Sequence, residues 1–328
     1  MAADPVAVLL TGVGKRYDIV SAFAEHAFTI AADPSPLAPA RYAADLRIAP
    51  PGIDDPDYVP FLEEVAAEHD VRAVIPLTDL DLEVLARSRL PAFVPDPDVC
   101  RATHDKHEAH RLLLRHGLPS PPTWLPDEEP DAYPVMVKPR RGSGARSIHP
   151  AADREQKDFF VRYVGEPVMV QRLLRGDHLS IDLLCDLDGR CLNAIPRTMI
   201  ESRGGESIKG TVVRDPELVE LGRAVGEALP VRGPCTVQVF RDPDLGLGIY
   251  DVNTRFGGAF PAPMYAARPG RGYPELIVRM AAGERIEPHV GDFADGMSFS
   301  RWYWQIELDE RCEPTGRDIL AGGPRPPR

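Results

Sequence analysis

The sequence predicts an α/β fold, with an α+β arrangement in its later part. Over residues 6–97 short apolar runs alternate with amphipathic stretches, which is typical of a parallel sheet with helices on both faces. From about residue 134 the pattern becomes richer in strands and hairpin turns. With 328 residues and 43 % hydrophobic content, the chain can hold one large domain or two to three smaller ones.

Each predicted element of the first part follows from its own run of residues. Runs such as VAVLLT, FTIAA and RAVIPL are short enough for buried strands, and the stretches between them have helical spacing. The expected strands are 6–11, 28–32, 46–50, 72–77 and 92–95, and the expected helices are the stretch through His26, 57–69 and 80–88. Proline-rich patches at 33–39, 50–56 and 91–97 are predicted loops.

The later part is predicted to begin with one helix over residues 103–117, which Gly117 ends. A proline-rich connector, LPSPPTW, separates this helix from the strand-rich region. There the expected elements are strands 134–140 and 166–174 around a helix at 153–163, a hairpin over 178–200, a helix at 215–229, a second hairpin with strands 234–241 and 247–254, and helical signal through Met280.

Charge and cysteine content narrow the function classes. A formal net charge of −12 argues against non-specific nucleic-acid binding, which needs a basic surface. Five cysteines without CxxC spacing predict a reduced, cytoplasmic setting rather than a disulfide framework or a zinc site. No apolar run reaches the roughly 18–20 residues of a membrane helix. The first apolar run lacks a preceding basic region, so we interpret it as a strand rather than a signal peptide.

The segment GIYDVNTRFGG carries the clearest sign of a site. In an extended strand Asp251, Asn253 and Arg255 lie on one face. The strand 234–241 precedes it, and a hairpin turning within DPDLG places Gln238 nearly opposite Asp251. Carboxylate and amide oxygens of this kind suit Mg²⁺ together with phosphate oxygens. The alternative is a polar-faced edge hairpin without a ligand.

Two further segments carry weaker signals. In VMVKPRRGSGARS, Lys138 ends a strand and a glycine loop follows, which allows backbone N–H groups to approach a phosphate. No G-K-[S/T] follows the glycines, so this is not a Walker loop, and a solvated basic turn is the alternative. In VMVQRLLRGDHLSID an apolar strand breaks at Gln171–Leu174, which exposes backbone groups that can bind a flat base.

In this order and spacing the segments resemble the ATP-grasp superfamily, and within it the carbamoyl-phosphate-synthetase-like carboxylate–amine ligases, over residues 6–288. THDKHEAHRLLLRHGLPSPPTW resembles the family's entry helix, and DVNTRFGG resembles its E-x-N-P-R motif. The resemblance implies a Rossmann-like pre-ATP-grasp domain (1–98), a linking helix (99–119), a lid (120–175), a core with the metal site (176–290), and a carboxy-terminal extension (291–328) with a disordered tail.

The resemblance also implies roles for individual residues. The nucleotide-binding set is Lys106, Lys138, Gly142, Ser143, Gly144, Ser147, Gln171, Leu173, Leu174, Asp177 and His178. The metal ligands are Gln238, Asp251 and Asn253, and the catalytic set is Arg255, Lys209 and Arg203. Arg197 and Glu201, in the segment PRTMIESRGGESIKG, are further candidates for holding the substrate, although Glu201 also fits an ordinary charged loop.

The implied activity is an ATP-dependent, ADP-forming ligation of a carboxylate to an amine through an acyl phosphate. The implied cofactors are ATP and two Mg²⁺ ions, for which Mn²⁺ can substitute. The expected partners are a small-molecule carboxylate and amine, with amino acids favoured, and neither nucleic acid nor a membrane; a homodimer is considered.

The sequence departs from the family pattern at three positions. Asp251 stands for the usual Glu, Thr254 for the usual Pro, and His178 for a ribose-binding Glu, a role that Asp177 can take instead. A non-catalytic ATP-binding protein therefore remains an alternative.

A second alternative rests on the amino-terminal glycines. Gly12, Gly14 and Asp33 suggest an NAD-dependent oxidoreductase, although Tyr17 occupies the place of the third glycine. Asp79 and Asp81 follow the strand RAVIPL, and we interpret them as solvated loop acids, with contact to the amine substrate as the alternative.

Overall fold

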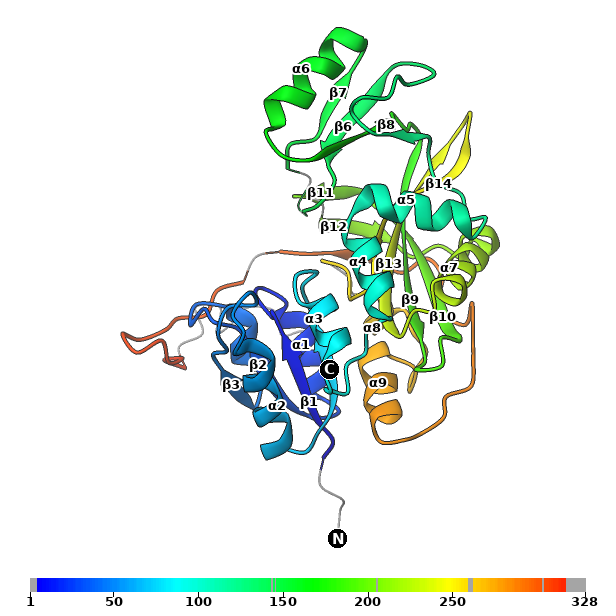
Figure 1. Ribbon diagram of the computed structural model, residues 1–328. Coiled ribbons are helices and arrows are strands. Elements are labelled where there is room, and N and C mark those ends of the chain that lie inside the picture. The colour runs from blue at the N-terminus through cyan, green and yellow to red at the C-terminus, as the bar shows by residue number, and fades with distance from the viewer. Residues whose placement is uncertain are drawn as a thin grey trace.

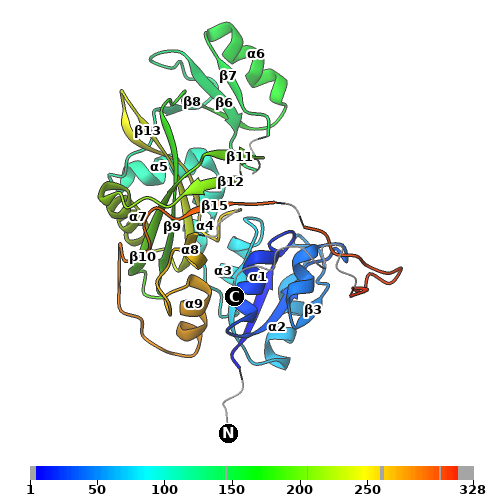
Figure 2. The same ribbon diagram turned by 180° about the vertical axis from the view of Figure 1, so that it is seen from behind.

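The computed structural model describes residues 5–142, 144, 146–204, 206–258, 262–302 and 304–316. The molecule has three parts, seen from opposite sides in Figures 1 and 2. An amino-terminal parallel sheet, drawn in blue, lies beside a central antiparallel sheet, and a small lid sheet stands at the far end of the central one. Within these described residues no helix is both long and apolar enough to cross a membrane.

The amino-terminal sheet has the predicted parallel topology, with strand order β3-β2-β1-β4. Its strands are β1 (Ala7–Thr11), β2 (Phe28–Ala32), β3 (Leu46–Ile48) and β4 (Val71–Pro76), and its helices are α1 (Tyr17–Ala24), the 3-10 helix η1 (Pro39–Ala43), α2 (Tyr58–Glu68) and α3 (Leu82–Arg87). Leu9, Ile30 and Val74 pack towards α2, while the opposite face packs against α1 and α9 (Tyr273–Ala281). Both faces of the sheet are buried, as continuous apolar strands require.

The predicted single helix over residues 103–117 is wrong, because the chain forms α4 (Pro97–His104) and α5 (Lys106–Arg115). Asp105 separates them in an extended conformation, and its carboxylate accepts hydrogen bonds from the N–H groups of His107 and Glu108 at 3.1 and 3.3 Å. An aspartate at this position satisfies donors that the first helical turn leaves unpaired. The cap therefore starts a new helix with Lys106 at its first position.

The lid is a four-stranded sheet covered by one helix. Its strands are β5 (Thr123–Trp124), β6 (Val135–Pro139), β7 (His149–Ala151) and β8 (Val168–Arg172), in the order β5-β8-β6-β7, and its helix is α6 (Arg154–Val164). Val135, Val137 and Val170 are buried against α6. Because side chains alternate along a strand, Lys138 and Gln171 belong to the opposite face.

The central sheet has the order β10-β9-β13-β14 and is antiparallel throughout. Its strands are β9 (Asp177–Cys185), β10 (Cys191–Thr198), β13 (Gly233–Asp242) and β14 (Gly246–Asn253). The apolar face packs on α5 and on α7 (Pro216–Ala228). The two hairpins are those that the sequence predicts.

A fourth, small sheet joins the core to the carboxy-terminal segment. β11 (Glu201–Arg203) and β12 (Glu206–Thr211) form a hairpin, and β15 (Ser298–Ser300) pairs with β12. From β15 the chain runs across to the amino-terminal domain, drawn in orange to red in Figures 1 and 2. There Arg301 pairs with Asp18 at 3.3 Å, and Arg47 pairs with Glu313 at 2.7 Å. The tail predicted to be disordered lies outside the described residues.

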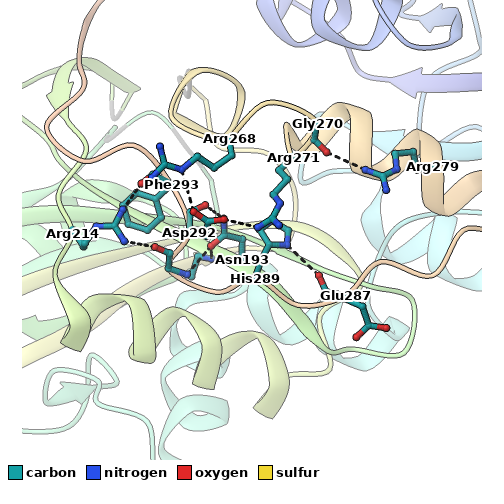
Figure 3. A network of polar contacts seen from close by, with 12 residues as sticks. Asn193, Arg214, Arg268, Gly270, Arg271, Arg279, Glu287, His289, Asp292 and Phe293 are labelled. Carbon is teal, nitrogen blue, oxygen red and sulfur yellow. Dashed lines mark hydrogen bonds and ion pairs between the residues drawn. The ribbon is translucent and has the colours of Figure 1, made fainter.

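A polar network holds the loop that follows α9 (Figure 3). Asp292 accepts hydrogen bonds from Arg268 at 3.1 Å and from Arg271 at 2.5 Å. Asn193 of β10 donates to the Asp292 carbonyl at 3.3 Å, and Arg214 donates to the Gly291 carbonyl at 2.6 Å. The network ties the segment between α8 (Ala262–Tyr265) and α9 to the edge of the central sheet.

Candidate nucleotide and metal site

One face of the central sheet carries rows of polar side chains. Gln238 lies directly opposite Asp251 in the β13–β14 pair, as the hairpin geometry predicts, and Thr236 lies opposite Asn253. β9 continues both rows, because it pairs Ser180 with Gln238 and Asp182 with Thr236. The sheet therefore brings the three predicted metal ligands, Gln238, Asp251 and Asn253, onto adjacent positions of one face.

A bulge in β14 adds an aromatic residue to this face. Gln238 pairs with Asp251 but Val239 pairs with Ile249, which leaves Tyr250 as an extra residue. The ring centroid of Tyr250 lies 5.4 Å from the Lys138 ammonium and 5.4 Å from the Phe240 ring centroid. Regular alternation assigns Tyr250 to the apolar face with Val252, so the sequence does not predict its place on the polar face.

Asp251, Asn253 and Arg255 form a chain of hydrogen bonds. Asn253 Nδ2 donates to Asp251 Oδ2 at 3.1 Å, and Arg255 Nη2 donates to Asn253 Oδ1 at 2.9 Å. Arg255 Nη2 also lies 2.6 Å from Asp79 Oδ2. Burial opposes the charged form of Arg255, but the attraction of Asp79 outweighs it and raises the pKa of the guanidinium above its ordinary value.

The oxygens on this face fit a magnesium ion. Gln238, Asp251 and Asn253 supply one carboxylate and two amide carbonyls, and Mg²⁺ commonly takes one or two protein carboxylate or carbonyl oxygens with phosphate and water completing its shell. Among the described residues, histidine, cysteine, aspartate and glutamate side chains do not gather in threes in a way that could bind a metal ion. A site with a single carboxylate therefore needs a phosphate to complete it.

Lys138 is enclosed between the lid and the central sheet. Its side chain is only 5 % exposed, and its ammonium donates to Gln171 Oε1 at 2.9 Å. Burial, aided by Lys106 and opposed by Asp251, lowers the pKa of Lys138 to about 8. Gln171 Nε2 in turn donates to Thr123 Oγ1 at 2.9 Å, so this glutamine orients the lysine through its side chain.

Lys106 connects the lid loop with the metal-site row. Its ammonium donates to the Gly142 carbonyl at 2.7 Å and lies 4.0 Å from Asp251 Oδ1. A small hollow between α5 and β14 is lined by Lys106, His110, Gln171, Tyr250 and Asp251, among others. The predicted first nucleotide lysine thus faces the predicted metal ligand.

The glycine loop after Lys138 turns through positive φ angles of 103° at Gly142, 81° at Gly144 and 53° at Ser147. A Cβ atom on Gly144 would lie 3.5 Å from the carbonyl oxygen of Gly204, in the turn between β11 and β12. The loop therefore approaches the hairpin that carries two of the predicted catalytic residues. Ser143, also predicted to bind nucleotide, lies outside the described residues.

The hinge after β8 is partly occupied by its own hydrogen bonds. The N–H groups of Arg172 and Leu173 donate to the carbonyls of Pro122 and Pro134 at 2.9 and 3.3 Å. These two donors are therefore not available to a base. Leu174 packs close to β14, because a Cβ atom added to Gly248 would lie 3.8 Å from its side chain. Adenine binding by Gln171, Leu173 and Leu174 stays a prediction, and it would have to use backbone groups other than the N–H groups of Arg172 and Leu173.

His178 takes part in an aromatic cluster with Phe240 and Tyr250. Its ring stacks on Phe240 with centroids 4.8 Å apart and planes 5° apart, and its Nε2 is hydrogen-bonded to the Tyr250 hydroxyl. Burial, together with the charge of Arg197, lowers the pKa of His178 to about 4. Asp177, beside it, is exposed at the start of β9. The neutral imidazole is directed at Tyr250.

The predicted catalytic residues Arg203 and Lys209 lie on the exposed β11–β12 hairpin. Lys209 Nζ donates to Glu201 Oε2 at 2.6 Å, and this bond lowers the pKa of the Glu201 carboxyl. Arg203 is exposed. The catalytic roles of Arg203 and Lys209 stay predictions.

A buried ion pair flanks the rows on the β10 side. Arg197 Nε lies 2.7 Å from Asp182 Oδ2, and Thr236 Oγ1 donates to Asp182 Oδ1 at 2.7 Å. Arg197 and Asp182 are 3 % and 1 % exposed, and Arg197 Nη1 has no hydrogen-bond partner among the described residues. Arg197 is a predicted substrate-binding candidate, whereas the sequence assigns no role to Asp182 and Thr236, which strand pairing brings side by side.

The interpretation of Asp79 and Asp81 as solvated loop acids is wrong. Asp79 pairs with Arg255, and Asp81 is 0 % exposed and accepts hydrogen bonds from Thr11 at 2.6 Å and Tyr58 at 2.8 Å. Burial raises the pKa of Asp81 to about 6. Partners that lie 70 and 176 residues away along the chain cannot be read from a loop sequence.

Asp33, the acidic residue beside the amino-terminal glycine turn, is hydrogen-bonded within the protein. Asp33 Oδ2 accepts the N–H of Gly14 at 2.8 Å, and Asp33 Oδ1 accepts the N–H of Ser35 at 2.9 Å. Both carboxylate oxygens of Asp33 are therefore already bound to backbone N–H groups. Arg16, in the same loop, donates to the carbonyl of Gly257 at 2.8 Å instead.

Comparisons with known proteins agree with this arrangement. Residues 8–92 match the PylC-like N-terminal domain, and residues 103–259 match the ATP-grasp domain. The chain is 29 % identical over 198 residues to the carbamoyl phosphate synthase large chain of Thermomicrobium roseum, covering 54 % of this chain but only 18 % of that protein.

Solved structures share the fold at low sequence identity. The biotin carboxylase domain of the Hydrogenobacter thermophilus 2-oxoglutarate carboxylase, a dimer in complex with MgADP and bicarbonate, has a TM-score of 0.70 at 19 % identity, over 90 % of this chain and 73 % of that one. The L-amino acid ligase of Bacillus licheniformis has a TM-score of 0.64 at 16 % identity, over 88 % and 78 %. The chain therefore carries an ATP-grasp domain over residues 103–259, preceded by a PylC-like amino-terminal domain over residues 8–92.

Proposed function

We propose that the protein is an ADP-forming carboxylate–amine ligase that uses ATP. The observation that carries the proposal is the placement of Lys106 and Lys138 around the same face as Gln238, Asp251 and Asn253. Two cations, one carboxylate and two amide oxygens suit a nucleoside triphosphate with Mg²⁺. The relatedness to carbamoyl phosphate synthase and the fold shared with an L-amino acid ligase support the reaction class.

In the proposed reaction the substrate carboxylate attacks the γ-phosphate of ATP, ADP leaves, and an amine then displaces phosphate from the acyl phosphate. Lys106 and Lys138 hold phosphate oxygens, and Arg255 neutralises charge on the transferred phosphoryl group. Gln238, Asp251 and Asn253 would hold Mg²⁺, which would neutralise negative charge on the phosphates. The enclosed position of Lys138 supports exclusion of water from the acyl phosphate.

The finer assignments are part of the same proposal. We propose two Mg²⁺ ions replaceable by Mn²⁺, amino acids as the carboxylate and amine substrates, and a homodimer. We also retain the division into residues 1–98, 99–119, 120–175, 176–290 and 291–328. A cytoplasmic setting is supported by the five free cysteines.

The experiment that tests the proposal measures ADP and phosphate release from Mg²⁺-ATP against pooled amino acids and small carboxylates, with product masses read alongside. We expect release that depends on a pool, and a new mass equal to two substrates less water. Tight ATP binding without turnover in any pool would favour the non-catalytic alternative. Absence of nucleotide binding would overturn the proposal.

A further inference from the structure

Two residues of the amino-terminal domain reach the turn that follows β14. Asp79, just after β4, lies 2.6 Å from Arg255 through its Oδ2. Arg16, just before α1, donates to the carbonyls of Phe256 and Gly257 at 3.2 and 2.8 Å. The amino-terminal domain therefore contacts the central sheet at the residue assigned to the transferred phosphoryl group, and not only through apolar packing.

Arg255 is held by three hydrogen bonds of different origin. Its Nη1 donates to its neighbour's carbonyl, that of Phe256, at 2.9 Å, and its Nη2 is shared between Asn253 Oδ1 and Asp79 Oδ2. The residue is 6 % exposed, whereas the Asp79 side chain is 24 % exposed. The short, charge-assisted hydrogen bond that Arg255 Nη2 donates to the partly shielded Asp79 carboxylate is the strongest of these contacts.

The charge balance around Arg255 gives this contact a specific consequence. Asp251 also attracts the guanidinium, and Asn253 bridges the two residues by hydrogen bonds. If Asp79 were neutral, Asp251 would be the remaining aspartate whose charge attracts the guanidinium. The guanidinium would then compete with Mg²⁺ for the same carboxylate.

We propose that Asp79 is a positioning residue that holds Arg255 away from Asp251 and directs its guanidinium towards the transferred phosphoryl group. This inference rests on the proposed function, because it takes Arg255 as the phosphoryl ligand. It assigns the amino-terminal domain a part in the reaction centre, although that domain supplies none of the metal ligands or phosphate-binding lysines.

The test uses the full-length chain and two probes, Mg²⁺-ADP and Mg²⁺-ADP with aluminium fluoride, which mimics the transferred phosphoryl group. Asp79→Asn is expected to bind Mg²⁺-ADP with an affinity within about two-fold of that of the unchanged chain. Its affinity for the complex with aluminium fluoride is expected to fall by about ten-fold or more, because a displaced Arg255 guanidinium no longer contacts the fluoride group. The Mg²⁺ concentration needed for half-maximal ADP binding is expected to rise, which loss of a merely structural contact would not cause.

A mutant cycle separates positioning from an independent role. Arg255→Ala is expected to lose affinity for the fluoride complex, and adding Asp79→Asn to it is expected to cost nothing more. Asp79→Glu keeps the charge and is expected to retain more affinity than Asp79→Asn. The matched control is Asp18→Asn, which removes another ion pair between the amino-terminal domain and the rest of the chain, that with Arg301, and is expected to leave both probes unaffected.

Each other outcome contradicts the inference. Normal affinity of Asp79→Asn for the fluoride complex would overturn it while leaving the proposed function intact, and so would a loss additive with that of Arg255→Ala. If Asp79→Asn and Asp79→Glu both fail to fold while Asp18→Asn folds, the pair serves stability and the inference is wrong. If the unchanged chain binds ADP equally with and without fluoride, the proposed function fails first, and the inference fails with it.

Discussion

The Lys138 ammonium donates a hydrogen bond of 2.9 Å to Gln171 Oε1 on the inner face of the lid. Burial lowers the pKa of Lys138 to about 8, so without nucleotide the residue is about half charged at that pH. Phosphate oxygens favour the charged form, so ATP binding must raise this pKa and take up a proton. We predict that ATP affinity is constant below about pH 7 and falls as the pH rises above about 8, by up to about ten-fold per pH unit.

The same pKa determines whether Lys138 makes the fold more or less stable as the pH rises. Because the folded-state pKa lies below the unfolded value of 10.5, the unfolded chain binds more protons between about pH 8 and pH 10.5. This residue's contribution to the free energy of unfolding therefore rises with pH in that window.

Calorimetric titration with ATP at several pH values measures the predicted fall in ATP affinity. Lys138→Arg, which stays charged, is the control and is expected to flatten the pH dependence; an identical fall in that variant would assign the titration to another group.

Replacement of Lys138 by methionine tests its role in the reaction directly. Lys138→Met keeps an unbranched apolar side chain in a buried position, so we expect the fold and Tm to be retained. The loss of the phosphate contact should abolish ADP formation. Unchanged turnover in this variant would remove the lysine from the site.

Asp251→Asn is predicted to raise the Mg²⁺ concentration required for activity. Asp251 is the one carboxylate among the three proposed ligands, and it lies 4.0 Å from the Lys106 ammonium. The isosteric amide keeps the shape but removes the charge that attracts the ion. We expect the Mg²⁺ midpoint to increase by about ten-fold or more, since hard cations favour anionic oxygen. Activity measured over a Mg²⁺ series decides this, and an unaltered midpoint would place the metal elsewhere.

The order of elements is predictable because periodicity and turn residues act locally. The parallel order of β1 to β4 and the two hairpins of the central sheet follow from short apolar runs and from turn residues such as Asp188 and Gly189. The break at Asp105 was missed, although the residue is a strong amino-terminal cap. In the sequence alone, Asp105 lies within a continuous helical pattern, and that pattern predicts one helix despite the capping residue.

Which side chains of the site face one another could be predicted from local geometry only where the residues belong to one strand or one hairpin. Gln238 and Asp251 face each other because the turn sets the register. Tyr250 was missed, because a bulge reverses the face of a residue without any local sign. Asp79 and Arg16 were missed as partners of the motif, because only the packing of the amino-terminal domain brings them to the turn after β14.

Asp182→Asn is predicted to destabilise the fold strongly. The change leaves the Arg197 guanidinium, 3 % exposed, without its anionic partner, and Arg197 Nη1 already has no hydrogen-bond partner among the described residues. Breaking a buried pair from one side costs about 3–5 kcal/mol of unfolding free energy. Urea unfolding measures it, with Glu83→Gln as control. Glu83 forms an exposed pair with Arg87 at 2.9 Å, so we expect less than about 1 kcal/mol there. Equal losses in the two variants would contradict the prediction.

Gly257→Ala tests how tightly the turn after Arg255 is held. A Cβ atom on Gly257 would lie 2.8 Å from Thr236 Oγ1, and Thr236 cannot yield because its hydroxyl is bound to Asp182 at 2.7 Å. The turn must therefore move, and Arg255 with it. We predict that nucleotide-dependent turnover falls about ten-fold or more, since displacements of about 1 Å are costly in an active site. A Cβ on Gly52 meets nothing within 4 Å, so Gly52→Ala is the control and should leave turnover unchanged. Adding Thr236→Ala to Gly257→Ala removes the two nearest atoms and should restore part of the turnover. If the double variant is no better than Gly257→Ala, the contact with Thr236 is not what positions the turn.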